Sequence, residues 1–364
     1  MSRDSTEEQT SHPAAGPLFV VGVPRSGTTL LYALLNQHPQ IALLHEGDLS
    51  LLWPLFLKRQ GKSQWLERWN FWNAGLERHQ IDITRIPSDV PNAKIATQMV
   101  CREYARKKRA TIWGDKSPGS HGSLGRLMVQ FPNARFVIIW RDPADVCRSI
   151  IRAGEDSRRF RRRGAVHRAL MGYCRLKIGR DRLLHSGIPV HEIQYQDLVL
   201  NPTEEMKKIC RFLGISFDGK MGSLHGADRS AVPPVGHNDL VKGENIVSSR
   251  QQPEALPINL KRKIERYQVF WREKYDDWPI FHPSQQINVR KPHLMERLYD
   301  QLFYRLLRGW DLAVVFIYCF APIGLLKAYR ALSVGKSPVP WPLGRLGQVR
   351  QSAYRDRRRG SPLS

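Results

Sequence analysis

The sequence predicts an α/β protein in which a parallel β-sheet is flanked by helices and begins with a P-loop-like turn. Short apolar runs alternate with segments of helical periodicity, the pattern of strand-helix-strand units. The run ARFVIIW at 134–140 is apolar on both faces, as expected for a strand buried inside a parallel sheet. A glycine-containing turn separates the first apolar run from the first helix. These three observations favour one α/β domain.

The elements can be assigned in chain order. The apolar run LFVVGV starts the sheet, and the helix after it has leucines at 30, 31, 34 and 35 and stops near Pro39. The tryptophan-rich region 49–109 reads as helices that cap the sheet. Further strands are expected at 111–116, 134–140 and 188–195, and further helices near 124–131, 142–151, 203–215 and 256–275. Asn201 and Pro202 open the helix at 203, and Gly214 ends it.

The chain divides into four parts by composition. We expect a flexible leader at 1–16, a catalytic domain at 17–290, a basic and apolar helical segment at 291–332, and a disordered basic tail at 333–364. The loop-rich stretch 219–254 lies within the second part, as a candidate lid. Its residues Ser248, Ser249 and Arg250 are candidate closing contacts.

The apolar stretch 312–326 has 15 uncharged residues, which is short of the roughly 20 needed to span a bilayer, and Pro322 interrupts it. Flanking arginine and lysine residues would suit a helix lying on an anionic membrane surface. The alternative is a C-terminal helix packed on the domain. The sequence leaves both open.

The net charge of +24 indicates anionic partners without specifying the fold. Five widely spaced cysteines without a C-x-x-C pair favour a reducing compartment over a disulfide framework. The first 17 residues contain no apolar run, so no signal peptide or N-terminal anchor is expected. We therefore expect a cytoplasmic protein, with association with the inner face of a membrane left open.

The segment Gly22-Val23-Pro24-Arg25-Ser26-Gly27-Thr28-Thr29 joins the first strand to the first helix. Such a turn directs backbone N–H groups at an anion beside a helix N-terminus. The P-loop of a kinase that binds a nucleoside triphosphate would have lysine where Thr28 stands, so this turn lacks that lysine. Arg25 supplies a guanidinium within the turn instead.

PRSGTTLL after an apolar strand resembles the 5′-phosphosulfate-binding loop of sulfotransferases that use 3′-phosphoadenosine-5′-phosphosulfate (PAPS), and WRDPADVCRS resembles their 3′-phosphate-binding segment. The likeness runs from Pro17 to Leu213. The acid at 46, DKSP at 115–118 and YQDLVLNP at 195–202 are most similar to the tyrosylprotein and related bacterial branches. The resemblance implies the sulfotransferase fold, PAPS as sulfuryl donor and an acceptor hydroxyl.

For the donor, we expect the backbone of Ser26, Gly27, Thr28 and Thr29, with the threonine hydroxyls, to hold the 5′-phosphate. Arg25 would stabilise the bridging oxygen and the sulfuryl group. Arg141 and Ser149 can converge on one phosphate, which the resemblance implies is the 3′-phosphate. Tyr195 can reach that phosphate or the purine, or simply pack in the core.

The resemblance implies that Glu46 is the catalytic carboxylate, a general base, and that Lys116 is a second cationic contact to the phosphosulfate. An exposed glutamate has a pKa of about 4.3, so Glu46 needs partial burial to be an effective base. His45 is the rival because imidazole titrates nearer neutrality. Both residues could instead belong to an exposed loop.

No cluster of His, Cys and carboxylate residues has zinc spacing, so no metal is expected. Two other functions compete with a sulfotransferase: a P-loop-like kinase or phosphotransferase, and a non-enzymatic module that binds anionic ligands. The basic tract 158–163 could bind an anionic acceptor or a membrane, but no nucleic-acid motif is present and nucleic acid is not expected as a partner. The acceptor is expected to carry a hydroxyl group on a lipid, a glycan or a tyrosine, with a mild preference for one in a membrane.

Overall fold

The computed structural model describes residues 16–57, 62–87, 89–156, 163–232, 243–244, 246, 256–275, 277 and 290–333. Several expectations fall on other parts of the chain. The leader up to residue 15, tract residues 158–162, the candidate lid contacts Ser248, Ser249 and Arg250, and the tail from residue 334 lie outside the described residues.

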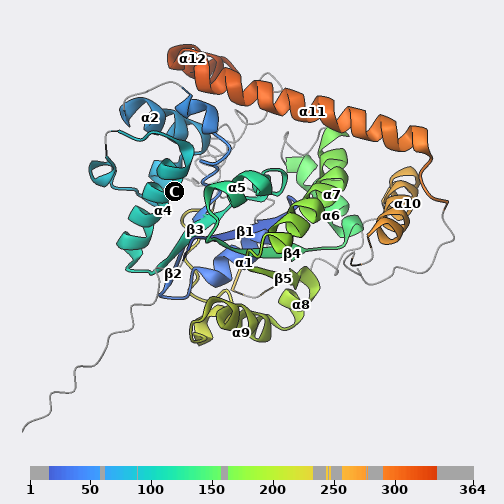
Figure 1. The fold of residues 1–364 in the computed structure, drawn as a ribbon, viewed down its shortest axis with the longest axis horizontal. Coiled ribbons are helices and arrows are strands. Elements are labelled where there is room, and N and C mark those ends of the chain that lie inside the picture. Colours follow the sequence, from blue (N-terminus) through green and yellow to red (C-terminus); the bar gives the residue numbers. More distant parts are fainter. Residues whose placement is uncertain are drawn as a thin grey trace, which may run out of the picture.

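The described chain folds around one five-stranded parallel sheet, which confirms the predicted α/β class (Figure 1). The strands lie in the order β2-β3-β1-β4-β5. Their bounds are β1 Leu18–Gly22, β2 Ile41–His45, β3 Ile112–Lys116, β4 Arg135–Trp140 and β5 Val190–Gln194. Because β1 lies between β3 and β4, the turn after β1 lies between the ends of these two strands.

Helices connect the strands and cover both faces of the sheet. The helices before β4 are α1 Thr28–Leu35, α2 Lys62–Asn73, α3 Gly75–His79, α4 Ala93–Lys108 and α5 Leu124–Gln130. Those after β4 are α6 Pro143–Asp156, α7 Arg163–His185, α8 Tyr195–Leu200, α9 Pro202–Leu213, α10 Ile258–Lys274, α11 Leu294–Phe320 and α12 Ile323–Ser333. Short 3-10 turns are η1 Trp53–Phe56, η2 Ile83–Arg85, η3 Pro118–Gly122 and η4 Gly219–Gly222.

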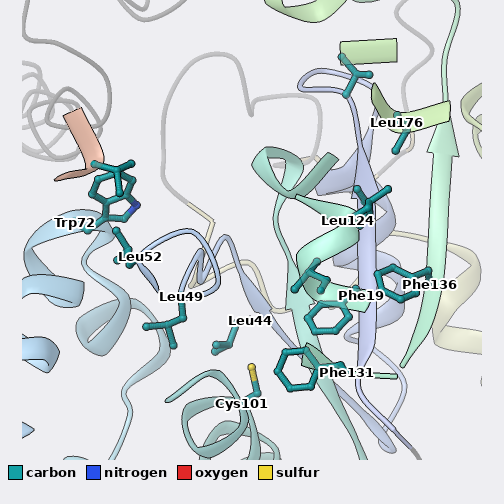
Figure 2. Packing of buried hydrophobic residues seen from close by; sticks show 14 of the residues in the cluster. Phe19, Leu44, Leu49, Leu52, Trp72, Cys101, Leu124, Phe131, Phe136 and Leu176 are labelled. Carbon is teal, nitrogen blue, oxygen red and sulfur yellow. The ribbon is translucent and has the colours of Figure 1, made fainter. Parts of the chain in front are cut away.

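Strand periodicity divides the core into two layers. Along β1, Phe19 and Val21 enter one apolar cluster, whereas Leu18 and Val20 enter the other, because successive side chains point to opposite faces. Figure 2 shows the first cluster, in which the Phe19 ring lies between those of Phe131 and Phe136, at centroid distances of 5.3 and 5.5 Å. Each strand of the sheet's centre is therefore covered on both sides.

Local signals set several helix ends. The Asn92 side chain accepts a hydrogen bond from the Ile95 amide and caps α4. Pro202 begins α9, and Gly214, at φ 71°, ends it as the sequence predicted. Pro322 follows the last residues of α11 and separates it from α12.

The C-terminal helix α11 packs along one side of the molecule, from the region of α10 to that of α2 (Figure 1). Its inner face is held by specific contacts: the Arg168 guanidinium pairs with Asp311 at 2.9 Å, and the Phe316 ring lies 5.8 Å from that of Trp53. One face of this helix thus belongs to the domain core.

Helix α1 begins directly after the turn that follows β1, so the packing of α1 in the core fixes the position of that turn. Leu31 on α1 is fully buried, and Leu31→Ala should lower the free energy of unfolding by about 3 kcal/mol, through lost burial and a residual cavity. Leu200→Ala on α8, where the side chain is 70% exposed, should change it by less than about 0.5 kcal/mol. Urea unfolding followed by circular dichroism measures both; equal losses would contradict the assignment of α1 to the core.

Candidate active site

The turn between β1 and α1 is bent by backbone conformations that favour glycine. Gly27 has φ 102°, and a Cβ added there would lie 2.4 Å from the Tyr195 ring. Arg25 also has a positive φ, 76°, and the Ser26 amide donates to the Val23 carbonyl at 3.0 Å. The turn therefore curls back on itself immediately before the amide groups that open α1, where an anion is favoured.

A polar atom in this turn is left for a ligand. Ser26 Oγ is buried and has no hydrogen-bond partner among the described residues. A Cβ on Gly22 would lie 2.4 Å from that oxygen, so a larger residue would fill the space beside it. A buried hydroxyl without a partner is costly unless a ligand or water satisfies it. The turn thus has the shape and the donor that a bound phosphate requires.

Two guanidinium groups meet beside the turn. Arg25 Nε donates to Ser149 Oγ at 3.2 Å, and Arg141 Nη1 donates to the Arg25 carbonyl at 2.9 Å. The Arg141 guanidinium also lies 4.1 Å from the centroid of the Tyr195 ring, which packs against Gly27. Burial, and second the positive charge of Arg141, lower the pKa of Arg25 to about 10, so Arg25 stays charged at neutral pH.

Lys116 links the turn to the end of β2. Its Nζ lies 3.3 Å from Thr29 Oγ1, 3.3 Å from Glu46 Oε1 and 2.8 Å from His45 Nε2. The Lys116 side chain is fully buried, whereas that of Glu46 is 19% exposed. Lys116 is the last residue of β3, within the strand expected at 111–116. The strand end holds the ammonium in place, and Glu46 is the group that reaches solvent.

His45 is a buried neutral acceptor. Burial is the larger cause that lowers its pKa well below the ordinary value, and the charge of Lys116 adds to it. A neutral imidazole has one donor and one acceptor nitrogen, and an ammonium only donates. The short contact to Lys116 makes Nε2 the acceptor and leaves the ring proton on Nδ1. His45 therefore positions Lys116 and has no free basic nitrogen facing the site.

Further residues support the bend after β2 and were missed in the sequence. Arg78 on α3 donates to the Glu46 carbonyl at 3.5 Å, and His79 Nε2 accepts from the His45 amide at 3.3 Å. Asp115 Oδ1 accepts from the Gly47 amide at 2.9 Å, and burial and nearby Asp48 raise its pKa to about 6. No motif distinguishes Arg78 among the 57 lysines and arginines, because only the packing of α3 brings it here.

The candidate donor-site and base residues that the structure describes come together at the carboxyl edge of the sheet. Glu46 follows β2, Lys116 ends β3, and Arg141 follows β4. Tyr195 was expected to end a strand but is the first residue of α8, directly after β5. Ligands of open parallel sheets bind at this edge. The arrangement can hold a multiply charged anion on Arg25, Lys116 and Arg141, beside one partly exposed carboxylate.

Comparisons with known proteins match this chain to sulfotransferases. A family model described as "Sulfotransferase family" matches residues 17–219. Protein-tyrosine sulfotransferase A of Caenorhabditis elegans is 28% identical over 247 residues, which are 62% of this chain and 60% of the relative. Protein-tyrosine sulfotransferase 2 of Gallus gallus is 30% identical over 226 residues, 59% of this chain and 55% of the relative. The chain thus spans somewhat more than half the length of these two relatives.

Among solved structures, the sulfotransferase domain from the curacin biosynthetic pathway matches with a TM-score of 0.50 and 19% sequence identity. The match covers 71% of this chain and 97% of that domain. At this identity the likeness concerns the fold alone.

The buried histidines predict an acid-sensitive fold. Burial and the charge of Arg78 lower the pKa of His79 to about 3, so the unfolded chain takes up a proton near pH 6.5 that the folded chain does not. The contribution of His79 to the free energy of unfolding is therefore fully present above about pH 6.5. It decreases as the pH is lowered, by about 2 kcal/mol between pH 7 and pH 5. In His79→Gln this part of the loss should disappear, as measured by urea unfolding at both pH values. An unchanged loss would contradict a neutral buried His79.

Proposed function

Since this chain belongs to the sulfotransferase family, we propose that it transfers a sulfuryl group from PAPS to the hydroxyl group of an acceptor. The observation that carries the proposal is the position of Lys116. Its amine lies 3.3 Å from both Thr29 in the anion-binding turn and the carboxylate of Glu46. One cation thus joins the donor-binding loop to the candidate base.

The residues of the site fit the two charged ends of PAPS. The turn at Ser26 to Thr29, with the unsatisfied Ser26 hydroxyl, would hold the 5′-phosphosulfate end together with Arg25 and Lys116. Arg141 and Ser149 would hold the 3′-phosphate. The Tyr195 ring packs against the Arg141 guanidinium. When bound, PAPS supplies the sulfuryl group and a stable phosphate leaving group.

Glu46 would accept the proton of the acceptor hydroxyl. Its carboxylate is partly exposed, so an acceptor can approach it, and Lys116 holds one oxygen in place. His45 is less suited to this role because its Nε2 accepts from Lys116 and its pKa is far below neutral. Arg25 and Lys116 would stabilise the charge that develops between donor and acceptor, the largest contribution expected in such a site.

The names of the matched relatives favour a tyrosine hydroxyl, and lipid or glycan hydroxyls fit the same chemistry. The donor site and the base do not distinguish among these acceptors, since each of them offers only a hydroxyl group to be deprotonated. The oxygen of any of them would attack the same sulfuryl sulfur, and the bisphosphate would leave with the bridging oxygen.

The donor can be tested by calorimetric titration with 3′,5′-adenosine bisphosphate and, separately, with ATP and magnesium. We expect micromolar binding of the bisphosphate and none of ATP. Ser149→Ala should weaken it by about 1 to 3 kcal/mol, the range for a hydrogen bond to a charged group, and Arg141→Ala should abolish it.

Arg211→Ala, at an exposed position on α9, is the matched control and should bind as the wild type does. Preference for ATP with magnesium would instead assign the site to a phosphotransferase. Tight bisphosphate binding without transfer to any of the three acceptor classes would favour a binding module.

The base can be tested separately from the donor contacts. Glu46→Gln keeps an oxygen for Lys116 but cannot take a proton, so turnover should fall about 100-fold or more while bisphosphate affinity changes less than about twofold. Arg25→Ala should lower turnover by at least about 100-fold, because it removes a contact to the developing charge. Steady-state sulfation kinetics and the titration above measure these effects. Glu204→Gln, at an exposed position on α9, should leave both values unchanged; equal loss of bisphosphate affinity in Glu46→Gln and Arg25→Ala would refute separate roles.

A further inference from the structure

Helix α11 has an outer face that is apolar along its whole length. Residues three or four apart lie on one side of a helix, and those on the side away from the domain are exposed. Leu302 and Leu306, in the middle of this side, are 58% and 64% exposed. The exposed apolar residues are Leu294, Met295, Leu298, Tyr299, Leu302, Leu306, Trp310, Leu312, Ile317 and Phe320. We call this set the outer stripe; from Met295 to Phe320 it runs about 38 Å at 1.5 Å per residue.

The carboxylates of α11 all point away from this stripe. Glu296 pairs with Arg266 at 3.0 Å, Asp300 with Lys263 at 2.7 Å, and Asp311 with Arg168 at 2.9 Å. Exposed cations border the stripe instead: Arg290 precedes α11, and Arg305 lies within the helix. Lys291, also before α11, pairs with Glu273 at 2.7 Å. A surface of this kind repels cations and is complementary to an anionic one.

A cavity of about 390 Å³ opens beside the stripe, between α7, α10 and α11. Its lining includes five cations and no aspartate or glutamate: Arg175, Arg182, Lys274, Arg297 and Arg305. Arg305 lies in sequence between Leu302 and Leu306 of the outer stripe, so the cavity mouth borders the stripe. The other exposed lining residues, among them Arg175 and Lys274, show that the cavity reaches the surface.

Two polar atoms of the cavity wall have no hydrogen-bond partner among the described residues. They are the Tyr304 hydroxyl, on a residue that is 5% exposed, and Arg297 Nε. Both are donors, and a buried donor is costly unless an acceptor satisfies it. A phosphate oxygen has the charge and the acceptor capacity that these donors and the surrounding guanidinium groups require.

We propose that the α11 side of the molecule binds the surface of an anionic membrane, with the outer stripe among the acyl chains near the head groups and a lipid phosphate in the cationic cavity. A helix with a long apolar face and flanking cations lies in the plane of such a surface, and each nearby lysine or arginine strengthens the attraction. No helix of the described chain is long and apolar enough to cross a bilayer. The proposed binding is peripheral, and it is electrostatic as well as apolar.

The occupant is a membrane rather than a second copy of the chain because of charge. Two copies facing each other through α11 would bring together the same cations, Arg305 and the cavity rim, without a carboxylate opposite them. Like charges across an interface oppose association. An anionic bilayer supplies the missing negative charge along the entire stripe.

The experiment is cosedimentation of the full chain with phosphatidylcholine vesicles that do or do not contain phosphatidylglycerol, at low and high salt. We expect binding to the anionic vesicles only, weakened by salt. Leu302→Glu combined with Leu306→Glu should lower the partition coefficient more than about tenfold, since it places charge in the stripe. Arg175→Ala combined with Arg305→Ala should lower it as well. Binding should also shift tryptophan emission to the blue, a shift that Trp310→Phe reduces.

The matched controls are Leu200→Glu, at a leucine on α8 that is 70% exposed, and Arg211→Ala, at an exposed arginine on α9; both should bind as the wild type does. Thermal melting checks that all variants are folded, and bisphosphate titration reports on the donor site separately. Three results would overturn the proposal: no binding to anionic vesicles by folded wild type, binding that survives the Leu302 and Leu306 substitutions, or a dimer in light scattering that these substitutions dissociate. Binding of inorganic phosphate that depends on Arg175 and Arg305, without vesicle binding, would also overturn it and assign the cavity to a soluble anion.

Discussion

The buried ammonium of Lys116 is the constraint on which the site depends. A charged amine that is fully shielded from water is stable only with several good acceptors around it. Those acceptors come from the end of β2, His45 and Glu46, and from Thr29 at the start of α1. The pairing of His45 with Lys116 in the β2–β3 register brings the first two within reach, and the β1–β3 pairing brings the third. The order of the strands in the sheet thus determines which residues meet around Lys116.

On the other side of β1, Arg141 links the turn after β1 to neighbouring elements of the site. Its guanidinium holds the Arg25 carbonyl and rests on the Tyr195 ring, and the ring in turn occupies the space that a side chain on Gly27 would need. The Tyr173 hydroxyl donates to the Arg141 carbonyl at 2.6 Å and anchors the strand end from α7. Arg141 is therefore held in place by contacts to neutral groups, whereas Lys116 pairs with the carboxylate of Glu46.

Helix α11 connects this site to the proposed membrane surface. Its Phe316 packs on Trp53 of η1, and Arg308 lies close to Gly122 of η3. Both turns come after strands whose carboxyl ends form the site, η1 after β2 and η3 directly after β3. Helix α11 therefore packs on the segments that follow the site residues Glu46 and Lys116. A protein bound to a membrane through the outer stripe would hold these segments near that membrane.

The sequence by itself determined the parallel α/β fold and most of the site, because these depend on local patterns. Apolar runs mark the strands, glycines at 22 and 27 mark the turn, and residues directly after parallel strands must meet at one edge. Only the tertiary structure decided what depends on contacts between distant segments: the neutral state of His45, the support from Arg78 and His79, and the separation of α11 into a packed and an exposed face. Periodicity could not distinguish a buried from a membrane-facing helix, because α11 is apolar on both sides and only its packing partners show which side the domain covers.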